Sequence, residues 1–550
     1  MATPEKQTAT EVHPLDAIVN RRLAQKGIAA APLCTDAEFL RRVCLDFSGA
    51  LPGAKKSREF LLDPAPSADK RRRLVEWALA RPEFADYWAM RWCDVLRVKS
   101  EFPSNLWPNA VQAYHAWLRA AFAADHPFDE VAREMLLSSG SNFRNPPVNF
   151  YRALTRRTPD EIAAQAAIVF MGVRLAPGSP DAEGFAAFFT NVRYKATGEW
   201  KEEIVYFAEN WPAYRSPRST TFVRAKFPFE RQPLFPGPAL PAAAAATRRR
   251  DGFAAPRESE SAAAARRRAA AAPVTPPGTN PQKLVADWLV SAKNPWFAAN
   301  YTNRVWAALF GRGIVEPVDN AGPANPPADP ALLALLARQF RENQHRLRPL
   351  LRFIATSETY QRSWRRNASN RADRECWSHR VPRRLDAEVL ADAIGSLTGA
   401  HEKFSSRIPE PLAFWPEDFR AVQNPDSSVT TSFLDMFGRP SRDTPFVHER
   451  DISPSMAQAI WLLNSSALNA KIEKKGGGVP RLARAFAAPE KHPALADELY
   501  LALLARFPSE KERTRVVRHL GDAAAGKTFL ARVCDVVWVL INTKEFLHNH

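Results

Sequence analysis

The 550 residues are enough for two to four domains of ordinary size, and a composition of 45% hydrophobic and 25% charged residues is that of a globular protein. The most apolar run, Val533 to Ile541, has about half of the roughly 20 residues that a membrane-spanning helix needs, which argues against an integral membrane protein. The net charge of +17 favours an anionic partner, but 12 Lys/Arg against 4 Asp/Glu between Arg215 and Thr275 give a local surplus of 8, nearly half of the excess.

The N-terminal part of the chain divides into a tail and a helical region. Residues 1–12 have no apolar segment, so we expect a disordered N-terminus without an export signal. Residues 13–210 are expected to form an N-terminal helical domain, because apolar residues recur every three to four positions between Pro and Gly breaks. Trp88 and Trp92, four positions apart, are typical of a buried helix face and not of base stacking beside Arg91.

Two helix starts can be predicted from capping residues. Thr35 is followed three positions later by Glu38, and Thr158 by Glu161. A threonine hydroxyl and a glutamate at this spacing can each accept a hydrogen bond from the other's backbone amide.

Residues 211–278 lose the periodicity and are rich in Pro, Ala and Arg, which predicts an irregular linker or inserted loop. The bias of tracts such as Ala262–Ala265 and Arg266–Arg268 is also compatible with a disturbed reading frame in GC-rich DNA, and sequencing the source gene would decide between the two. Nucleic acid is expected to make only weak, nonspecific and salt-sensitive contact with this basic stretch.

The rest of the chain is again helical. We expect a second helical domain at 279–475 and a C-terminal helical unit at 476–550 that packs on it, with helices near Pro493–Arg506, Ser509–Leu520 and Phe529–Leu547. The predicted fold is therefore mainly α and multi-helical, with two helical domains packed together, an irregular linker and little β structure.

Cysteine and histidine patterns predict no metal site. The cysteines are odd in number, scattered and never in a C-x-x-C pair, which is typical of small core residues: Cys34, Cys44, Cys93, Cys376 and Cys534. No H-E-x-x-H occurs, and His448 beside Glu449 lacks a second ligand at helical spacing. His548 and His550 are expected to belong to a frayed polar tail.

One segment matches a nucleotide-binding motif in its residue sequence but not in its expected structural context. Gly521 to Thr528 fits G-x-x-x-x-G-K-T, with Lys527 as the lysine. A phosphate-binding loop follows a buried strand, whereas Lys511 to Leu520 has the pattern of an amphipathic charged helix, so we expect a helix-to-helix turn and no nucleotide.

No complete catalytic constellation is present, but several charged residues are candidates for acid/base or binding roles. For any one of them a helix cap or an ion pair is the more ordinary function, and a carboxylate pair is diagnostic only when its separation is known. The candidates are Asp94, Arg97, Glu203, Asp435, Arg439, His448 and Glu449.

Ordered motifs over nearly the whole chain outside the linker resemble a known pair of domains. In the first half the matching segments are His13–Ala17, Phe39–Gly49 and Tyr87–Arg97. In the second half they are Asn294–Ala298, Asn303–Trp306, Phe310–Pro317, Thr356–Gln361, Arg383–Glu388, Phe433–Pro440, Leu462–Asn464 and Asn542–His550. The chain resembles planctomycete and verrucomicrobial proteins in which a cytochrome-associated domain of unknown function precedes a surface domain of unknown function.

The resemblance implies no established activity, and its members are commonly exported to the periplasm or cell surface and often travel with c-type haem modules. Many relatives carry C-x-x-C-H after the segment that matches Phe170–Leu175, whereas this chain continues into Phe185–Phe189. Without the two cysteines and the axial histidine, covalent haem is excluded. The chain is similar to the haem-less branch, which also has the segment Thr197–Ile204, and we expect no cofactor.

Three functions are weighed against one another. The leading hypothesis is a non-haem helical binding or scaffolding module of an exported, cell-surface-related system, with an unknown protein or polysaccharide partner. The alternative is a hydrolase that acts on a polyanionic glycan through carboxylates such as Asp94 or Glu203 in a cleft between the two halves. A redox role would need a cofactor that the sequence does not supply. Substrate, oligomeric state and localisation remain open at this stage.

Overall fold

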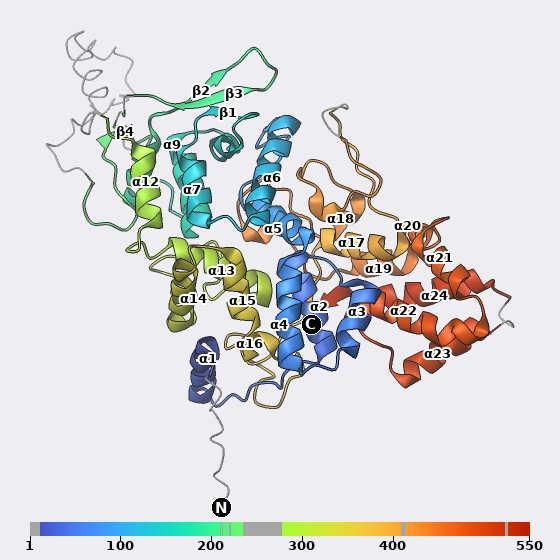
Figure 1. Ribbon diagram of the computed structural model, residues 1–550. Helices are drawn as coiled ribbons and strands as arrows, with labels where there is room; N and C mark the ends of the chain where they lie inside the picture. The colour runs from blue at the N-terminus through green and yellow to red at the C-terminus, as the bar shows by residue number, and fades with distance from the viewer. Residues whose placement is uncertain are drawn as a thin grey trace, which may run out of the picture.

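The computed structural model describes residues 12–209, 211, 213–218, 222–234, 278–408, 414–522 and 526–550. The described chain is mainly helical with small sheets, which confirms the predicted fold class (Figure 1). The expected disordered residues 1–11 and most of the expected linker, residues 235–277, lie outside the described residues.

The first half begins with long helices and ends with shorter ones. They are α1 (Pro14–Gln25), α2 (Asp36–Ser48), α3 (Gly53–Leu62), α4 (Ser67–Leu79), α5 (Pro82–Val95), α6 (Trp107–Ala123), α7 (Phe128–Leu137), α8 (Asn149–Arg152), α9 (Pro159–Ala166) and α10 (Pro180–Ala186). Short 3₁₀ turns lie at Pro146–Val148 and Ala187–Phe189, and α9 continues into a π-helical turn at Ala167–Met171.

The predicted caps are present, one of them in altered form. Thr35 Oγ1 accepts from the Glu38 amide and the Glu38 carboxylate accepts from the Thr35 amide, which completes the capping box at α2. Thr158 caps α9 in the same way, but the Glu161 carboxylate accepts from the amides of Arg156 and Arg157 instead of the Thr158 amide. The reciprocal half of that box is therefore replaced by bonds to the preceding loop.

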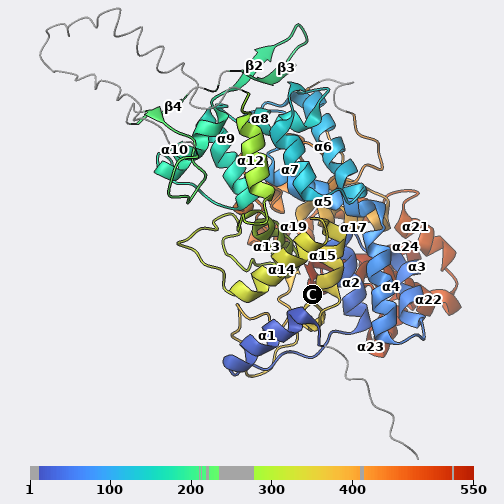
Figure 2. The same cartoon turned by 60° about the vertical axis from the view of Figure 1, so that its left-hand side comes forward.

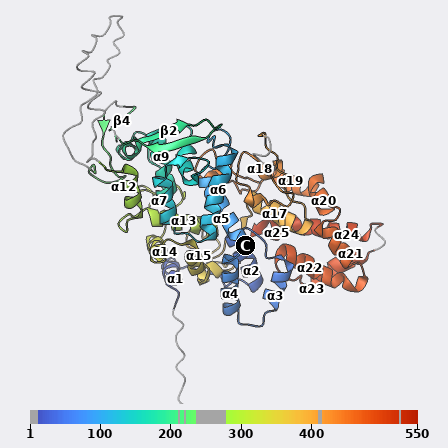
Figure 3. The same cartoon turned by 45° about the horizontal axis from the view of Figure 1, so that its top comes forward.

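The strands are short and antiparallel. Strands β1 (Gly140–Ser141), β3 (Glu203–Phe207) and β2 (Val192–Ala196) form one sheet in that spatial order, with Tyr194 opposite Val205. This sheet lies at an edge of the molecule away from the C-terminal helices (Figures 1 and 3). The remaining pairs are β4 (Tyr214–Arg215) with β5 (Phe222–Val223), and β6 (Arg383–Arg384) with β7 (His548–Asn549).

Part of the expected linker packs against both halves. Strands β4 and β5 fall within it, and Phe227 stacks on Trp288 of the second half at 4.5 Å and on Phe188 of the first half at 4.8 Å between ring centroids. These aromatic contacts show how a segment without helical periodicity is packed.

The second half continues with helices α12 to α25. They are α12 (Pro281–Val290), α13 (Phe297–Phe310), α14 (Pro330–Glu342), α15 (Leu347–Ala355), α16 (Glu358–Gln361), α17 (Ala387–Thr398), α18 (Ser432–Met436), α19 (Met456–Asn464), α20 (Ser466–Ile472), α21 (Gly478–Ala485), α22 (His492–Leu504), α23 (Glu510–Gly521), α24 (Phe529–Ile541) and α25 (Lys544–Leu547). Short 3₁₀ turns lie at Ala421–Gln423, Val447–Glu449 and Pro489–Lys491.

The last predicted helix is divided in two. Thr543 interrupts it, because its hydroxyl accepts from the Phe546 amide and starts α25 as a new helix. The expectation of a frayed tail was also wrong: β7 pairs with β6, and Asn549 is buried with its side chain donating to Asp46 at 2.7 Å.

The two halves share one core. Helix α1 packs on α14 and α16, α7 packs on α12, and the π-helical turn packs on α13. The C-terminal helices contact α17 of the second half, and α22 also packs on α3 of the first (Figures 1 and 2). The described cysteines are all buried and unpaired, as predicted.

Buried arginines connect distant parts of the chain. Arg41 of α2 donates to the carbonyl oxygens of Leu503 at 2.8 Å and Phe546 at 2.7 Å. Asp46, one turn further along α2, accepts from Tyr360 Oη at 2.8 Å and pairs with Arg380 at 3.1 Å. Because a buried charge is tolerated only when it is paired and hydrogen-bonded, these contacts hold α2 to the second half and to the C-terminal strand.

Candidate functional site

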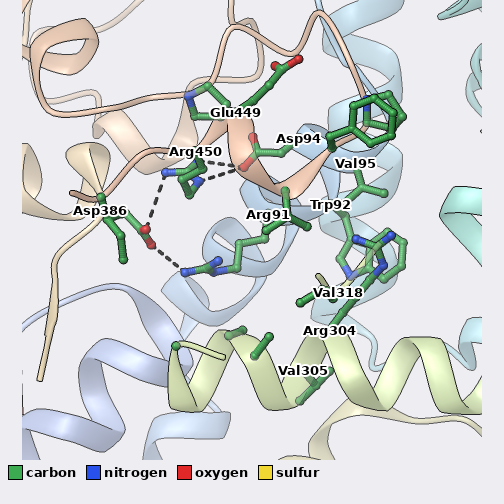
Figure 4. A pocket seen from close by; sticks show the side chains of 18 of the residues that line it. Arg91, Trp92, Asp94, Val95, Arg304, Val305, Val318, Asp386, Glu449 and Arg450 are labelled. Carbon is green, nitrogen blue, oxygen red and sulfur yellow. Dashed lines mark hydrogen bonds and ion pairs between the residues drawn. The ribbon is translucent and has the colours of Figure 1, made fainter. Parts of the chain in front are cut away.

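A cavity of about 200 Å³ lies between the two halves, and we call it the interdomain pocket. Helix α5 of the first half forms one side, α13 another, and the loop 440–452 of the second half covers it (Figure 4). Four carboxylates and five arginines line it: Asp94, Glu316, Asp386 and Glu449, with Arg91, Arg304, Arg312, Arg383 and Arg450.

Helix α5 is held in place by its aromatic residues. Trp88 and Trp92 are almost fully buried, as the spacing predicted, and Trp92 stacks on Tyr301 of α13 at 5.5 Å between ring centroids. Arg91 and Asp94 lie on the same helix and line the pocket. The aromatic residues of α5 therefore pack into the core and, together with its charged residues, line the pocket.

The loop 440–452 is attached to the first half through Arg174 and Asp319. The Arg174 guanidinium lies over the Phe446 ring at 4.3 Å and pairs with Asp319 at 2.6 Å. The second Asp319 oxygen accepts from the Val447 amide at 3.0 Å. Segments of both halves therefore fix the cover of the pocket.

Arg450 is the centre of the charge network. It donates to Asp94 at 2.8 and 3.0 Å and to Glu388 at 2.7 and 3.0 Å, and it lies 3.8 Å from Asp386 (Figure 4). Arg442 binds the other Asp94 oxygen at 2.9 Å. Burial alone would raise the pKa of Glu388, but Arg450 and then Arg439 hold that pKa at about 2. Glu388 is therefore ionised at neutral pH.

Arg91 and Arg304 face the pocket in different electrostatic states. Arg91 pairs with Asp386 at 2.7 Å. Arg304 donates only to neutral oxygens, Asn300 Oδ1 at 3.0 Å and the Ile168 carbonyl at 2.8 Å, and has no carboxylate within ion-pair distance in the described part of the chain. Burial lowers the Arg304 pKa to about 10, so it is still charged at neutral pH.

The position of Arg304 is set by the π-helical turn. Asn300, one turn before it on α13, donates to the Val169 carbonyl at 2.8 Å, so both side chains satisfy carbonyl oxygens of that turn. Gly172 ends the turn with φ +68°, and a Cβ there would lie 2.4 Å from Asn300 Oδ1. Only glycine allows this close approach of the two halves.

Three buried N–H groups of pocket-lining side chains have no hydrogen-bond partner among the described residues. They are Trp88 Nε1, Arg91 Nε and Arg383 Nε. Most buried donors in proteins have an acceptor, so these three groups are exceptions among the side chains that line the cavity.

Of the residues predicted from sequence, the structure brings Asp94 and Glu449 to the pocket. Asp94 is occupied by Arg442 and Arg450. Glu449 accepts from the amides of Asp443 and Thr444, so it holds the loop.

The other predicted residues lie outside the lining and have structural partners. Arg97 donates to Thr155 Oγ1 at 3.3 Å, and Asp435 accepts from Thr430 Oγ1 at 2.7 Å. Glu203 on β3 pairs with Arg152 at 2.7 Å and Arg157 at 2.8 Å. Arg439 is buried against Glu388 at 3.5 Å, and His448 stacks on Phe446.

Sequence reasoning missed Arg304, Arg383, Asp386 and Arg450 as site residues. Three of them fall within segments that carried the family resemblance, Asn303–Trp306 and Arg383–Glu388. The presence of a charged residue within a segment that carried the family resemblance could therefore have indicated these site residues. No local spacing, however, relates α5 to residues almost 300 positions later in the chain.

The nucleotide and metal patterns have ordinary surroundings. Helix α23 precedes the G-x-x-x-x-G-K-T segment, as predicted, and Lys527 pairs with Asp535 of α24 at 2.9 Å. No group of three or more His, Cys, Asp or Glu residues that could hold a metal ion occurs in the residues that the structure describes. Within the same residues, no helix is both long and apolar enough to cross a membrane.

Comparison with known protein families gives two matches, one in each half. The family PSCyt2, a protein of unknown function (DUF1549), matches residues 14–176, and PSD1, a protein of unknown function (DUF1553), matches residues 282–520. No curated protein and no solved structure matches the chain. Helix α5 lies in the first match, and α13 and the loop 440–452 lie in the second, so the pocket is formed between them. The chain belongs to the family in which a PSCyt2 domain is followed by a PSD1 domain, both of unknown function.

Proposed function

We propose that the protein is a non-haem binding module whose interdomain pocket holds a small anionic ligand. The observation that carries this proposal is the set of three unpartnered N–H groups, on Trp88, Arg91 and Arg383. A buried donor without an acceptor costs about 1–3 kcal/mol. A ligand rich in oxygen acceptors would recover that free energy on binding.

The charge of the pocket selects the class of ligand. Arg304 is partly buried and positively charged, and its donors meet only neutral oxygens among the described residues. Guanidinium groups bind carboxylates through paired charge-assisted hydrogen bonds. A cavity of about 200 Å³ suits a small carboxylate, and a single sugar acid is the ligand that we favour.

The test compares glucuronate with glucose by isothermal titration calorimetry. The two sugars differ at the carboxylate, so we expect glucuronate to bind and glucose not to bind. Trp88→Phe removes one unpartnered N–H and should weaken glucuronate affinity about tenfold, from the cost of one hydrogen bond to a charged group. Trp77→Phe, on α4 outside the pocket, is the matched control and should leave the affinity unchanged.

If glucuronate and glucose give no heat, or if Trp88→Phe binds glucuronate as tightly as the parent protein, the cavity is a water-filled seam between the halves and this proposal fails. Thermal unfolding of both tryptophan variants separates a binding defect from a folding defect.

We further propose that the module works in an exported, cell-surface-related system with a protein or polysaccharide partner. The support is the resemblance of its ordered motifs to planctomycete and verrucomicrobial surface proteins. Fractionation of cells that express the native gene with a C-terminal tag should recover the protein in the envelope or periplasm. Recovery in the cytoplasm alone would contradict this part of the proposal.

Hydrolysis of a polyanionic glycan gains no support from the carboxylates named for it. Asp94 is neutralised by two arginines at the pocket, and Glu203 is paired with two arginines on β3, outside the pocket lining.

A further inference from the structure

A second and larger hollow lies where three parts of the chain meet, and we call it the C-terminal groove. It has a volume of about 1160 Å³ and is lined by the start of α2, by the segment 364–382, and by the C-terminal helices α22, α23 and α25. It shares no lining residue with the interdomain pocket. Its size suits several linked units of an extended ligand.

The groove carries an excess of positive side chains. Seven Lys/Arg and three Glu line it. The glutamates are occupied: Glu38 pairs with Arg365 at 3.2 Å, and Glu512 and Glu545 both bind Arg506, at 2.8 and 2.6 Å. The other five cations are exposed and have no carboxylate within ion-pair distance among the described residues: Arg366, Arg374, Lys511, Arg515 and Lys544.

Two of these cations stand together on one helix. Lys511 and Arg515 are four residues apart on α23, so their side chains lie on the same face and repel each other. Lys511 is also in the first turn, where the helix dipole disfavours a positive charge. An anionic ligand that contacts both would relieve this repulsion.

The groove also offers groups that suit hydroxyls and a sugar ring. Trp364 is 40% exposed, and its orientation is fixed by a hydrogen bond from Nε1 to Glu38 at 3.0 Å and by the Arg365 guanidinium 5.4 Å from its ring. His379, His548 and His550 line the groove, and burial lowers the pKa of each below its ordinary value near 6.5, which favours neutral rings at pH 7. Neutral histidines and glutamates both accept hydrogen bonds from hydroxyls.

We propose that the C-terminal groove binds an acidic oligosaccharide. The free cations meet its carboxylate or sulfate groups, the glutamates and histidines accept from its hydroxyls, and one face of a sugar ring lies against Trp364. A single-stranded nucleic acid fits less well, because such ligands stack successive bases on several aromatic side chains and the groove lining offers one exposed aromatic ring.

The test measures binding of three hexameric probes to the whole protein by calorimetry at several salt concentrations. The probes are a heparin-derived hexasaccharide, a hexagalacturonate and oligo(dT)₆. We expect one or both saccharides to bind at least tenfold more tightly than the oligonucleotide, and their affinity to fall with salt because ionic contacts are screened. Preference for heparin or for galacturonate identifies sulfate or carboxylate as the anionic group.

Variants then place the ligand in the groove. The double variant Lys511→Gln/Arg515→Gln should lower saccharide affinity about tenfold or more, whereas Arg518→Gln, an exposed cation of the same helix that does not line the groove, should not change it. Trp364→Ala should weaken both saccharides but not oligo(dT)₆. All these side chains are at the surface, and thermal unfolding checks that each variant is folded.

The proposal is overturned if the oligonucleotide binds as tightly as the saccharides. It is also overturned if Arg518→Gln lowers affinity as much as the double variant, because the binding would then follow overall charge and not the groove.

Discussion

The interdomain pocket and the C-terminal groove are both lined by several positively charged side chains, but these charges have opposite surroundings. In the pocket, Arg91 and Arg450 are held by carboxylates at 2.7–3.0 Å. In the groove, Lys511 and Arg515 are exposed and unpaired. Burial makes an unpaired charge very costly, whereas water solvates an exposed one. Positive groups in the interior are therefore hydrogen-bonded, either to carboxylates, as Arg450 is, or to neutral oxygens, as are the buried Arg41 and the partly buried Arg304.

The largest effect is expected from breaking the pairing in the interior. Arg450→Met removes a partner of both Asp94 and Glu388 and leaves the buried Glu388 and the partly buried Asp94 with weaker compensation. Loss of one partner from a buried ion pair costs about 3–5 kcal/mol. We therefore expect the free energy of unfolding, measured by urea denaturation, to fall by that amount.

Lys511→Met is the matched control from the groove, with the same change of side chain class at an exposed position. Its free energy of unfolding should stay within about 0.5 kcal/mol of the parent protein. Equal losses of unfolding free energy for Arg450→Met and Lys511→Met would show that burial does not determine how much a charged side chain contributes to stability.

The next predicted effect is the dependence of stability on pH, which compares two buried carboxylates within the interior. The pKa of Glu388 is about 2 in the folded protein, below its ordinary value near 4.5, so between these pH values the unfolded chain binds more protons. The stability that Glu388 contributes is therefore complete above pH 4.5 and is lost as the pH falls toward 2. The difference in unfolding free energy between the parent protein and Glu388→Gln should shrink over that range, and parallel pH curves would contradict the assignment.

Asp392, one turn further along α17, should have the opposite slope. Its pairing is weaker, with Arg420 at 3.5 Å, and burial raises its pKa to about 6. The folded protein then binds more protons than the unfolded chain between about pH 4 and 6, so ionisation of Asp392 costs stability as the pH rises. Relative to the parent protein, Asp392→Asn should gain stability across this window, and a constant difference in urea denaturation would refute the expectation.

The sequence predicted the helices well because periodicity and caps are local. The spacing of Trp88 and Trp92 gave the buried face of α5, and Thr35 with Glu38 gave the start of α2. Thr543 shows the limit of this reasoning, since a capping residue in the polar segment after Ile541 divided a helix that periodicity alone extended.

The site could not be predicted in the same way, because its charges are paired over long sequence distances. Asp94 and Arg450 are 356 positions apart, and neither has a local pattern that indicates burial. No local pattern indicated that Arg41 and Arg442 are almost fully buried. The net charge of +17 does not distinguish arginines that are paired with carboxylates in the folded protein from arginines that are exposed and unpaired.

The smallest predicted effect separates the two kinds of exposed cation on one helix. Lys511 lies in the first turn of α23, near the positive end of the helix dipole and four residues from Arg515, whereas Arg518 lies in the last turn, where a cation is favourable. Lys511→Gln should therefore raise the free energy of unfolding by a few tenths of a kcal/mol, about the size of one helix-end charge effect, and Arg518→Gln should lower it by a similar amount. Parallel urea titrations at low salt measure this difference, and added salt should abolish it.

If Lys511→Gln is also the variant that no longer binds the acidic oligosaccharide, then Lys511 occupies a position that is unfavourable for the free protein and favourable for the complex. If both glutamine variants lower stability equally, the positive charge at Lys511 carries no such cost, and one of the arguments for a ligand in the groove is lost.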